Sequence, residues 1–520
     1  MGGIVGKREK RWRLLPVLVL GPALLYTFFR WVWPVLYSVD LPVAYGRTPR
    51  FSLRLVPEPG YQVQPVRNLT RREKLMTETE YIYRVQAWKG EAGRLSVILQ
   101  RFHNGDLLFF VASRGVLSQP EPLARLQLRV AGAQPRRGYA IACEATGSLR
   151  PRPVWQPVHP DRLPGWLPEG LVFLEGEGYS LVTGPVNLFR DLGHGVVKEV
   201  SIGKVGVHAG RNASLYEIPL QGWNDGESRV WGVLSEHSLV EWNARGEIAS
   251  LQRGELSWNR KFWRDGSYDP IPSSYVPSHP RGYWRCPAQH IGRLFAGEPG
   301  RYAAVITLSS MYSCIRTQNQ AGYWPTTPKS TWLAKDYGIG HDFFDTRFNT
   351  DGALFLLEAY QKYGEAKALA AAERYARFLC DYARQYSYRT ANGGYLVPDY
   401  MDPSGRAGTH TALNHLVAEM NFLYSMYVAT GNSSYRQVAD RMRQAVKDTR
   451  DGWIKEDGEL WYAYLPNGNF GLKDYPTLTL NDLRQGQELI REITGRPDPD
   501  FTRLILAKEG YNRRHGIPLR

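Results

Sequence analysis

The 520-residue sequence predicts a multidomain α+β protein with an N-terminal membrane anchor, β-rich modules and a C-terminal α-helical, (α/α) toroid-like domain. Three observations predict this fold class. A basic segment followed by an apolar run opens the chain, short apolar runs separated by turn residues continue to about residue 275, and helical periodicity follows. The expected divisions are an anchor at 1–40, β-rich modules at 41–165 and 166–300, and a catalytic helical domain at 301–520.

The N-terminal segment KREKRWR precedes an apolar run from Leu14 to Phe29, which Arg30 interrupts. The run is short for a spanning helix, but Arg30 can extend its charged end to the interface. No A-x-A pattern follows, which favours an uncleaved anchor over the alternative of a cleaved signal peptide. The basic residues place this end in the cytoplasm, so we expect a single-pass membrane protein with an extracytoplasmic catalytic domain.

Strand signals dominate from about residue 41 to 275. The segment RLSVILQRFHNGDLLFFVAS contains two apolar runs around His-Asn-Gly-Asp, which predicts a tight β-hairpin. The Pro-rich segment PRPVWQPVHPDRLPGW at 151–166 lies at the expected boundary between the two modules. We therefore expect one or two β-modules here, with this segment as a linker between them or as a loop lying over a groove.

Helical periodicity begins after a Pro/Tyr/Ser-rich loop at 267–284, with apolar residues recurring three and four positions apart. The connecting loops carry Trp, Tyr, Asp and His residues, a pattern typical of an (α/α) toroid whose loops line a carbohydrate groove. The expected helices cover 303–315, 352–363, 366–386, 411–430 and 434–446.

Composition narrows the class of partner. The formal charge of +15 indicates attraction to an anion, and 16 Trp and 31 Tyr offer faces that stack on sugar rings. No nucleic-acid-binding motif is present, so we expect an acidic polysaccharide and a membrane surface, with a homodimer as an option. The cysteines form no C-x-x-C pair, which argues against a zinc ribbon and leaves one disulfide open; they are Cys143, Cys286, Cys314 and Cys380.

Three segments occur in order in the helical part: GYWPTTP (322–328), VPDYMDP (397–403) and KDYPTLTLNDLRQGQELIREITG (473–495). Together they resemble the C-terminal domain of the D-glucuronyl C5-epimerases, which act on heparosan-type polysaccharides. The resemblance covers roughly residues 310–510. It implies a uronyl C5-epimerase, an isomerase that converts D-glucuronate to L-iduronate within the polymer.

The resemblance also implies site residues. Asp399 and Tyr400 match the family's Glu-Tyr pair, and Tyr475 matches the tyrosine of its Asp-Tyr-His-Thr segment. Tyr464 or Tyr462 matches the tyrosine of its Tyr-Asp-Leu-Arg motif, whose arginine has no counterpart here. The expected catalytic residues are Asp399, Tyr400, Tyr464 and Tyr475, and the expected substrate-binding residues are Trp324, Tyr462, Lys473 and Arg484.

C5 epimerisation explains these residue types. A proton next to a carboxylate must leave one face of the ring and return on the other, so two proton-transfer groups are needed. The intermediate needs a cation at its carboxylate, for which Lys473 or Arg484 is available. A tyrosine, with a pKa of about 10, becomes a base only if nearby groups favour its anion. We expect Tyr400, beside Asp399, on one face and Tyr475 with Tyr464 on the other.

Two other clusters of histidine and acidic residues occur in the helical part. In GHDFFDTRF, His341 with Asp342 and Asp345 could suggest a metal site, but the two phenylalanines favour a half-buried turn, so neither metal nor cofactor is expected. His415 and Glu419 are one helical turn apart, which favours a structural hydrogen bond. The alternatives to an epimerase are a polysaccharide lyase and a non-catalytic polysaccharide-binding or assembly protein.

Overall fold

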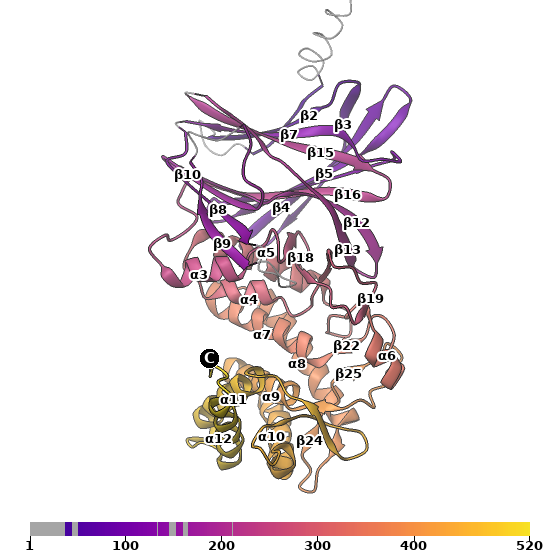
Figure 1. The fold of residues 1–520 in the computed structure, drawn as a ribbon, viewed down its shortest axis with the longest axis vertical. Coiled ribbons are helices and arrows are strands. Elements are labelled where there is room, and N and C mark those ends of the chain that lie inside the picture. Colours follow the sequence, from indigo (N-terminus) through magenta and orange to yellow (C-terminus); the bar gives the residue numbers. More distant parts are fainter. Residues whose placement is uncertain are drawn as a thin grey trace, which may run out of the picture.

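Strands build the N-terminal part of the protein and helices build the C-terminal part. This computed structural model describes residues 37–43, 50–132, 134–144, 152–159, 165–210 and 212–519. The molecule is elongated, with the β-rich part at one end and the last helices at the other (Figure 1). The two parts meet through three helices: α3 (Arg245–Arg253), α4 (His290–Ala296) and α5 (Arg301–Thr317).

Nineteen described strands form one connected network. The predicted hairpin around His-Asn-Gly-Asp is confirmed, because Leu99 pairs with Phe109 and the turn contains Gly105 at φ +90°, where glycine is favoured. The strands of the network are β1 (Val39–Leu41), β2 (Phe51–Pro57), β3 (Tyr61–Arg72), β4 (Met76–Ala87), β5 (Gly90–Phe102), β6 (Leu107–Gly115), β7 (Glu121–Ala131), β8 (Arg137–Glu144), β9 (Arg152–Pro157), β10 (Leu171–Gly176), β11 (Tyr179–Thr183), β12 (Val186–Gly193), β13 (Val196–Gly203), β14 (Gly206–Ala209), β15 (Ala213–Trp223), β16 (Gly226–Ser235), β17 (Lys261–Trp263), β18 (Gly266–Pro270) and β20 (Gly282–Arg285).

Strand β5 shows how the network serves two cores. Side chains alternate between the faces of a strand. Leu95, Val97 and Leu99 enter a core formed within the β-rich part, whereas Ile98 and Phe102 enter a second core. That second core also contains residues of every long helix, so the sheet and the helices share it.

The predicted helices are confirmed, with somewhat different ends. Helix α9 lies at the centre of the helical part, since it contacts α7, α10 and α11. The described helices are α3 (Arg245–Arg253), α4 (His290–Ala296), α5 (Arg301–Thr317), α6 (Thr331–Tyr337), α7 (Thr346–Tyr363), α8 (Ala366–Tyr386), α9 (Leu413–Thr430), α10 (Ser433–Trp453), α11 (Leu478–Thr494) and α12 (Pro499–Arg514). Short strands in the loops are β19 (Tyr275–Val276), β21 (Lys329–Ser330), β22 (Phe344–Asp345), β23 (Tyr388–Arg389), β24 (Tyr395–Leu396), β25 (Tyr400–Met401), β26 (Thr411–Ala412), β27 (Trp461–Tyr464) and β28 (Phe470–Lys473).

The predicted fold class is wrong. Instead of separate β-modules, strands on both sides of residue 165 pair with one another, as Ile141 of β8 does with Leu171 of β10. Instead of a self-contained toroid-like domain, the helices share their core with the sheet, from Phe110 through Tyr302 to Leu504. The described residues thus form a β-rich protein with one large sheet network and ten helices.

The predicted membrane anchor and single-pass localisation are also corrected. Among the residues described, no helix combines the length and the apolar character needed to cross a bilayer. The run from Leu14 to Phe29, on which that prediction depended, lies outside the described residues.

Candidate active site

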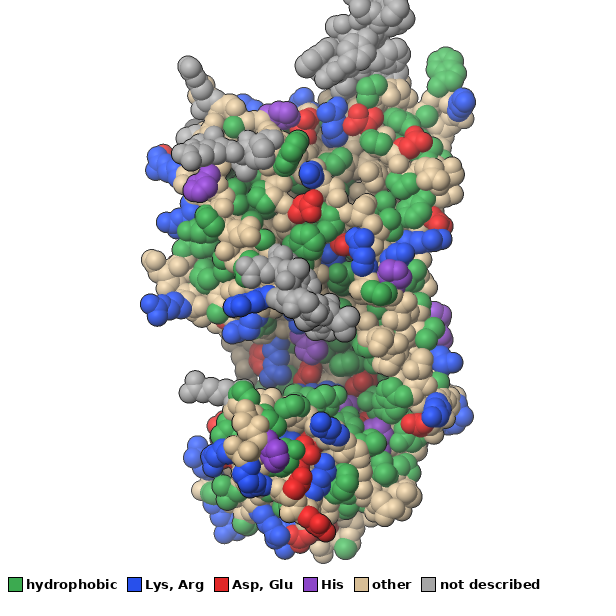
Figure 2. Space-filling view, in the orientation of Figure 1, with side chains coloured by type: hydrophobic (Ala, Val, Ile, Leu, Met, Phe, Trp, Pro, Cys, Tyr) green, Lys and Arg blue, Asp and Glu red, His purple; other side chains and the backbone are tan. Residues whose placement is uncertain are grey.

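A cavity of about 990 Å³ lies among the loops of the helical part. Its lining comes from segments 272–275, 332–351, 400–415 and 462–478, together with His290 of α4. The surface is hollowed between the β-rich part and the last helices, where basic, acidic and histidine side chains gather (Figure 2). The volume is at the upper end of the range of about 300–1,000 Å³ found for ligand pockets.

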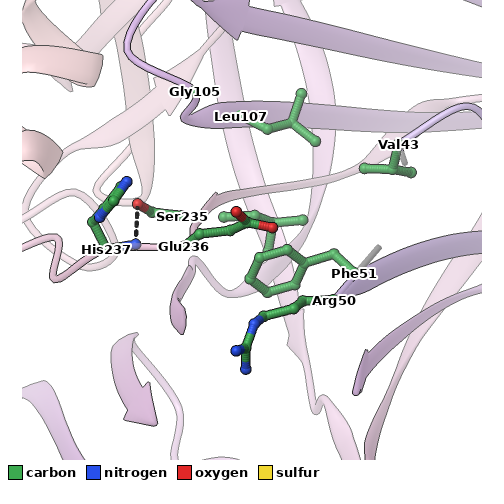
Figure 3. A pocket seen from close by; sticks show the side chains of 9 residues that line it. Val43, Arg50, Phe51, Gly105, Leu107, Ser235, Glu236 and His237 are labelled. Atoms are coloured by element: carbon green, nitrogen blue, oxygen red, sulfur yellow. Dashed lines mark hydrogen bonds between the residues drawn. The ribbon is translucent and has the colours of Figure 1, made fainter. Parts of the chain in front are cut away.

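A second, smaller cavity of about 80 Å³ lies in the β-rich part, beside the turn between β5 and β6. The close view in Figure 3 shows Arg50, Phe51 and Glu236 around it, with the hydroxyl of Ser235 accepting a hydrogen bond from the backbone N–H of His237 at 3.0 Å. Its volume is below the usual range for ligand pockets. The cavity of about 990 Å³ brings together ionisable side chains from several segments, so it is the candidate site.

Four of the predicted site residues line the large cavity: Tyr400, Tyr462, Lys473 and Tyr475. The rings of Tyr462 and Tyr475 meet edge to face, with their centres 5.7 Å apart. Burial raises the pKa of all three tyrosines above the usual value. Tyr475 is 49 % exposed, so it is the tyrosine of this group most open to solvent.

The other predicted residues lie away from the cavity wall. The fully buried Trp324 donates from Nε1 to the carbonyl of Cys314 at 2.9 Å. Tyr464 packs against Tyr388 and Phe470. Arg484 pairs with Glu509 at 2.8 Å. The roles assigned to these three side chains stay predictions.

Asp399 lies directly behind the cavity wall and is fully buried. Its Oδ1 accepts a hydrogen bond from the backbone N–H of Ala412 at 2.8 Å, which ties the segment before α9 to the loop carrying Tyr400. Its Oδ2 lies 3.3 Å from Nε2 of His410 and 3.5 Å from Nδ1 of His415. Both histidines line the cavity, so the carboxylate acts on the site through them.

The structural hydrogen bond expected between His415 and Glu419 does not form among the described residues. Nδ1 of His415 lies 2.9 Å from the hydroxyl of Thr346 instead, and neither carboxyl oxygen of the buried Glu419 has a hydrogen-bond partner there. Burial lowers the pKa of His415 to about 4 and raises that of Glu419. His415 is therefore neutral at physiological pH.

Asp345 is a site residue that the sequence reasoning considered only as a metal ligand. It caps α7 by accepting a hydrogen bond from the backbone N–H of Phe348 at 3.0 Å, and pairing of β22 with β25 places it opposite Tyr400. Burial, and then the charge of Asp399, raise its pKa to about 7 in spite of the capping bond. His341, its supposed partner, stacks on His194 instead, at 3.6 Å.

Cations of the cavity differ in whether they are already paired. Arg347 is held by Asp482 at 2.6 Å and Asp351 at 3.1 Å. Burial alone would lower the pKa of His290, but hydrogen bonds to Asp269 and Asp351 raise it to about 9. Lys473 of β28 makes no ion pair within the described residues and is exposed, so its charge is available to a ligand.

One group of side chains has the spacing of metal ligands. Ligand atoms of Asp269, Cys286 and His290 lie within 4.8 Å of one another. However, Arg260 already binds the carboxylate of Asp269 at 2.8 Å. The imidazole of His290 lies between two carboxylates, so this group is complete as an ion-pair network.

No protein-family model and no curated protein matches the chain. Among solved structures, it is similar to a D-mannose isomerase (14 % identity, TM-score 0.33, 44 % of this chain and 59 % of that one). It is also similar to a glycoside hydrolase family 76 mannosidase from Bacteroides thetaiotaomicron (16 %, 0.34, 46 % and 65 %) and to the cellobiose 2-epimerase from Bacillus thermoamylovorans (11 %, 0.32, 45 % and 60 %). These proteins are sugar isomerases, epimerases and glycoside hydrolases, and this chain spans less than two thirds of the length of each.

Proposed function

We propose that the large cavity epimerises C5 of uronic acid residues in an acidic, heparosan-like polysaccharide, converting D-glucuronate to L-iduronate. The observation that carries the proposal is the meeting of Tyr400, Tyr462, Tyr475 and Asp345 in one cavity that also presents the exposed Lys473. Proton-transfer groups and a cation are the parts that this reaction needs. The excess of basic residues over the whole chain favours an acidic polymer.

In this proposal, Lys473 binds the substrate carboxylate and stabilises the charge that builds up on it when C5 loses its proton. The pKa of Asp345, raised to about 7, allows this side chain to hold or release a proton at neutral pH. The half-exposed Tyr475 can exchange its proton with solvent between turnovers. C5 would therefore take up hydrogen from water.

The test is incubation with heparosan in heavy water, with NMR detection of deuterium at C5. We expect exchange with the wild-type protein and a loss of at least about 10²-fold in Tyr475→Phe and in Tyr400→Phe, because each removes a hydroxyl at the cavity. Tyr427→Phe is the matched control, since Tyr427 lies on α9 outside the cavity lining and should leave the rate unchanged.

Three results would contradict the assignment. Exchange at the wild-type rate in both cavity variants would remove the tyrosines from the mechanism. An unsaturated product absorbing in the ultraviolet would identify a lyase, which expels the 4-oxygen after the same proton abstraction. Binding of the polymer without any exchange would identify a non-catalytic polysaccharide-binding protein.

A substitution of Lys473 tests the carboxylate contact. We expect Lys473→Met to lower kcat/KM for the uronan about 10-fold to 100-fold, because the intermediate loses its cation. The exposed Lys335→Met on α6 is a control of equal charge change outside the cavity lining. Equal effects of the two substitutions would mean that Lys473 acts only through the general field of the protein.

A further inference from the structure

Three side chains from separate segments form a line that ends at the large cavity. Nε2 of the buried His410 lies 3.3 Å from Oδ2 of Asp399, and its Nδ1 lies 3.0 Å from the hydroxyl of Tyr337. Tyr337 is the last residue of α6, and its half-buried side chain lines the cavity. The line therefore runs from a buried carboxylate, through an imidazole, to a phenol at the cavity.

The environment of Asp399 sets the direction of the protons along this line. Its Oδ1 is occupied by the backbone N–H of Ala412, so Oδ2 is the oxygen that faces the histidines. Oδ2 and Nε2 of His410 are 3.3 Å apart without the geometry of a hydrogen bond, but the nearby carboxylate still favours the tautomer of His410 that carries its proton on Nε2. Nδ1 is then an acceptor, and the hydroxyl of Tyr337 donates to it.

Aromatic packing holds the imidazole in this orientation. The ring of Trp332 lies 5.8 Å from that of His410 and 5.6 Å from that of Tyr400. The imidazole of His410 also contacts two tyrosine rings: the ring of Tyr400 lies 5.7 Å away and that of Tyr462 lies 5.9 Å away. Substitution of His410 would therefore also disturb the aromatic packing of the cavity wall.

We infer that Tyr337 is a proton-transfer group of the cavity, and that His410, oriented by Asp399, is the acceptor that makes this phenol a base. The inference rests on the proposed C5 epimerisation and adds a residue and a proton path to it. It also answers a chemical requirement of that reaction, because a phenol becomes a base at neutral pH only when another group takes its proton.

Proton abstraction from C5 begins at Tyr337. The O–H bond of Tyr337 breaks and its proton moves to Nδ1 of His410, whose positive charge Asp399 stabilises. The phenolate oxygen then takes the proton from C5 of the uronate, and the electrons of the C–H bond pass to the carboxylate as an enediolate. A hydroxyl of a different segment, such as that of Tyr475, returns a proton to C5. Tyr337 ends the step as a phenol again; His410 then loses its extra proton to water, and the Tyr475 phenolate takes up a proton from water.

The first test needs no substrate. Nitrogen-15 NMR of the full chain, with His410 assigned by the signal lost in His410→Gln, should show an unprotonated Nδ1 and a protonated Nε2. In Tyr337→Phe, the Nδ1 signal should shift because its donor is gone, whereas Nε2 stays protonated. A proton on Nδ1 in the wild-type protein would overturn the inference, since Tyr337 could then not donate to it.

The second test uses deuterium exchange at C5. We expect Tyr337→Phe to lower kcat at least about 10²-fold with little change in KM. Asp399→Asn should cause a similar loss, because its amide favours the other tautomer of His410. The double variant should lose no more than the worse single variant, which is the behaviour of residues acting as one unit.

The matched control is Tyr388→Phe, whose hydroxyl donates to the carbonyl of Thr409 beside His410 but lies outside the cavity lining. It should keep exchange within about twofold of wild type. Exchange in Tyr337→Phe at the rate of this control would overturn the inference while leaving the epimerase proposal intact. If the wild-type protein exchanges no C5 hydrogen, the epimerase proposal fails, and with it the role of Tyr337, whatever tautomer the nitrogen signals report.

Discussion

Lys508→Met is expected to lower the free energy of unfolding by about 3–5 kcal/mol, the usual cost of removing one partner of a buried ion pair. Lys508 and Asp474 are both fully buried, and their charged atoms lie 2.7 Å apart. Glu459 adds a second carboxylate 3.6 Å from the same nitrogen. Without Lys508, the carboxylate of Asp474 would have no ion-pair partner among the described residues, whereas Glu459 would keep its ion pair with Lys455 at 2.9 Å. Urea denaturation of both proteins measures the difference.

Two further variants separate this cause from a loss of packing. Lys447→Met removes a lysine that is 33 % exposed and 3.8 Å from Asp498, and it should cost less than about 1 kcal/mol. Asp474→Asn combined with Lys508→Met removes both charges of the closest pair and should recover part of the loss. A double variant as unstable as Lys508→Met would show that the methylene stem, and not the charge, is what matters.

Asp345→Asn is expected to stabilise the fold at alkaline pH, by up to about 4 kcal/mol. The pKa of this carboxyl is about 7 in the folded protein, against 3.8 without its surroundings. The folded state therefore binds more protons than the unfolded state between these values, and stability falls as the pH rises through this range. Asparagine retains the oxygen that caps α7 but carries no charge, so it avoids this loss.

The measurement is urea denaturation of wild type and Asp345→Asn at pH 4 and pH 8.5. The two proteins should be nearly equally stable at pH 4 and differ most at pH 8.5. Asp336→Asn is the control, because Asp336 is an exposed carboxylate on the same cavity and should give a difference within about 0.5 kcal/mol at either pH. A pH-independent difference for Asp345→Asn would mean that its carboxyl is not desolvated.

Local patterns in the sequence predicted local structure well. The turn residues at 103–106 identified the β5–β6 hairpin, and apolar periodicity identified α5 and α7–α10. Pairing between distant strands was not predictable in this way. Strands β7 and β15 pair over ten residues although a large part of the sheet lies between them in sequence, and no local pattern specifies such a partner. The Pro-rich segment at 151–166 resembles a module boundary locally, and only the long-range pairing of β8 with β10 shows that the sheet continues across it.

The residues indicated by the resemblance include some on the cavity wall and others away from it. Tyr400 and Tyr475 line one cavity although 75 positions separate them. Trp324 illustrates the limit, because an aromatic side chain in a loop can face a sugar or fill a core, and only packing decides between them. The sequence alone does not indicate the pairing of Tyr337 with His410, because their side chains meet across 73 positions of the chain.

The core shared by sheet and helices bears on how the chain is made. Synthesis proceeds from the N-terminus, so the strands leave the ribosome before α7 to α12 exist. Side chains such as Phe173, whose ring lies 5.3 Å from that of Tyr302 on α5, then lack part of their apolar cover until the helices arrive. The cavity therefore forms last, when the helices pack against strands that are already made. Until then, the apolar face of the sheet is exposed to chaperones and to aggregation.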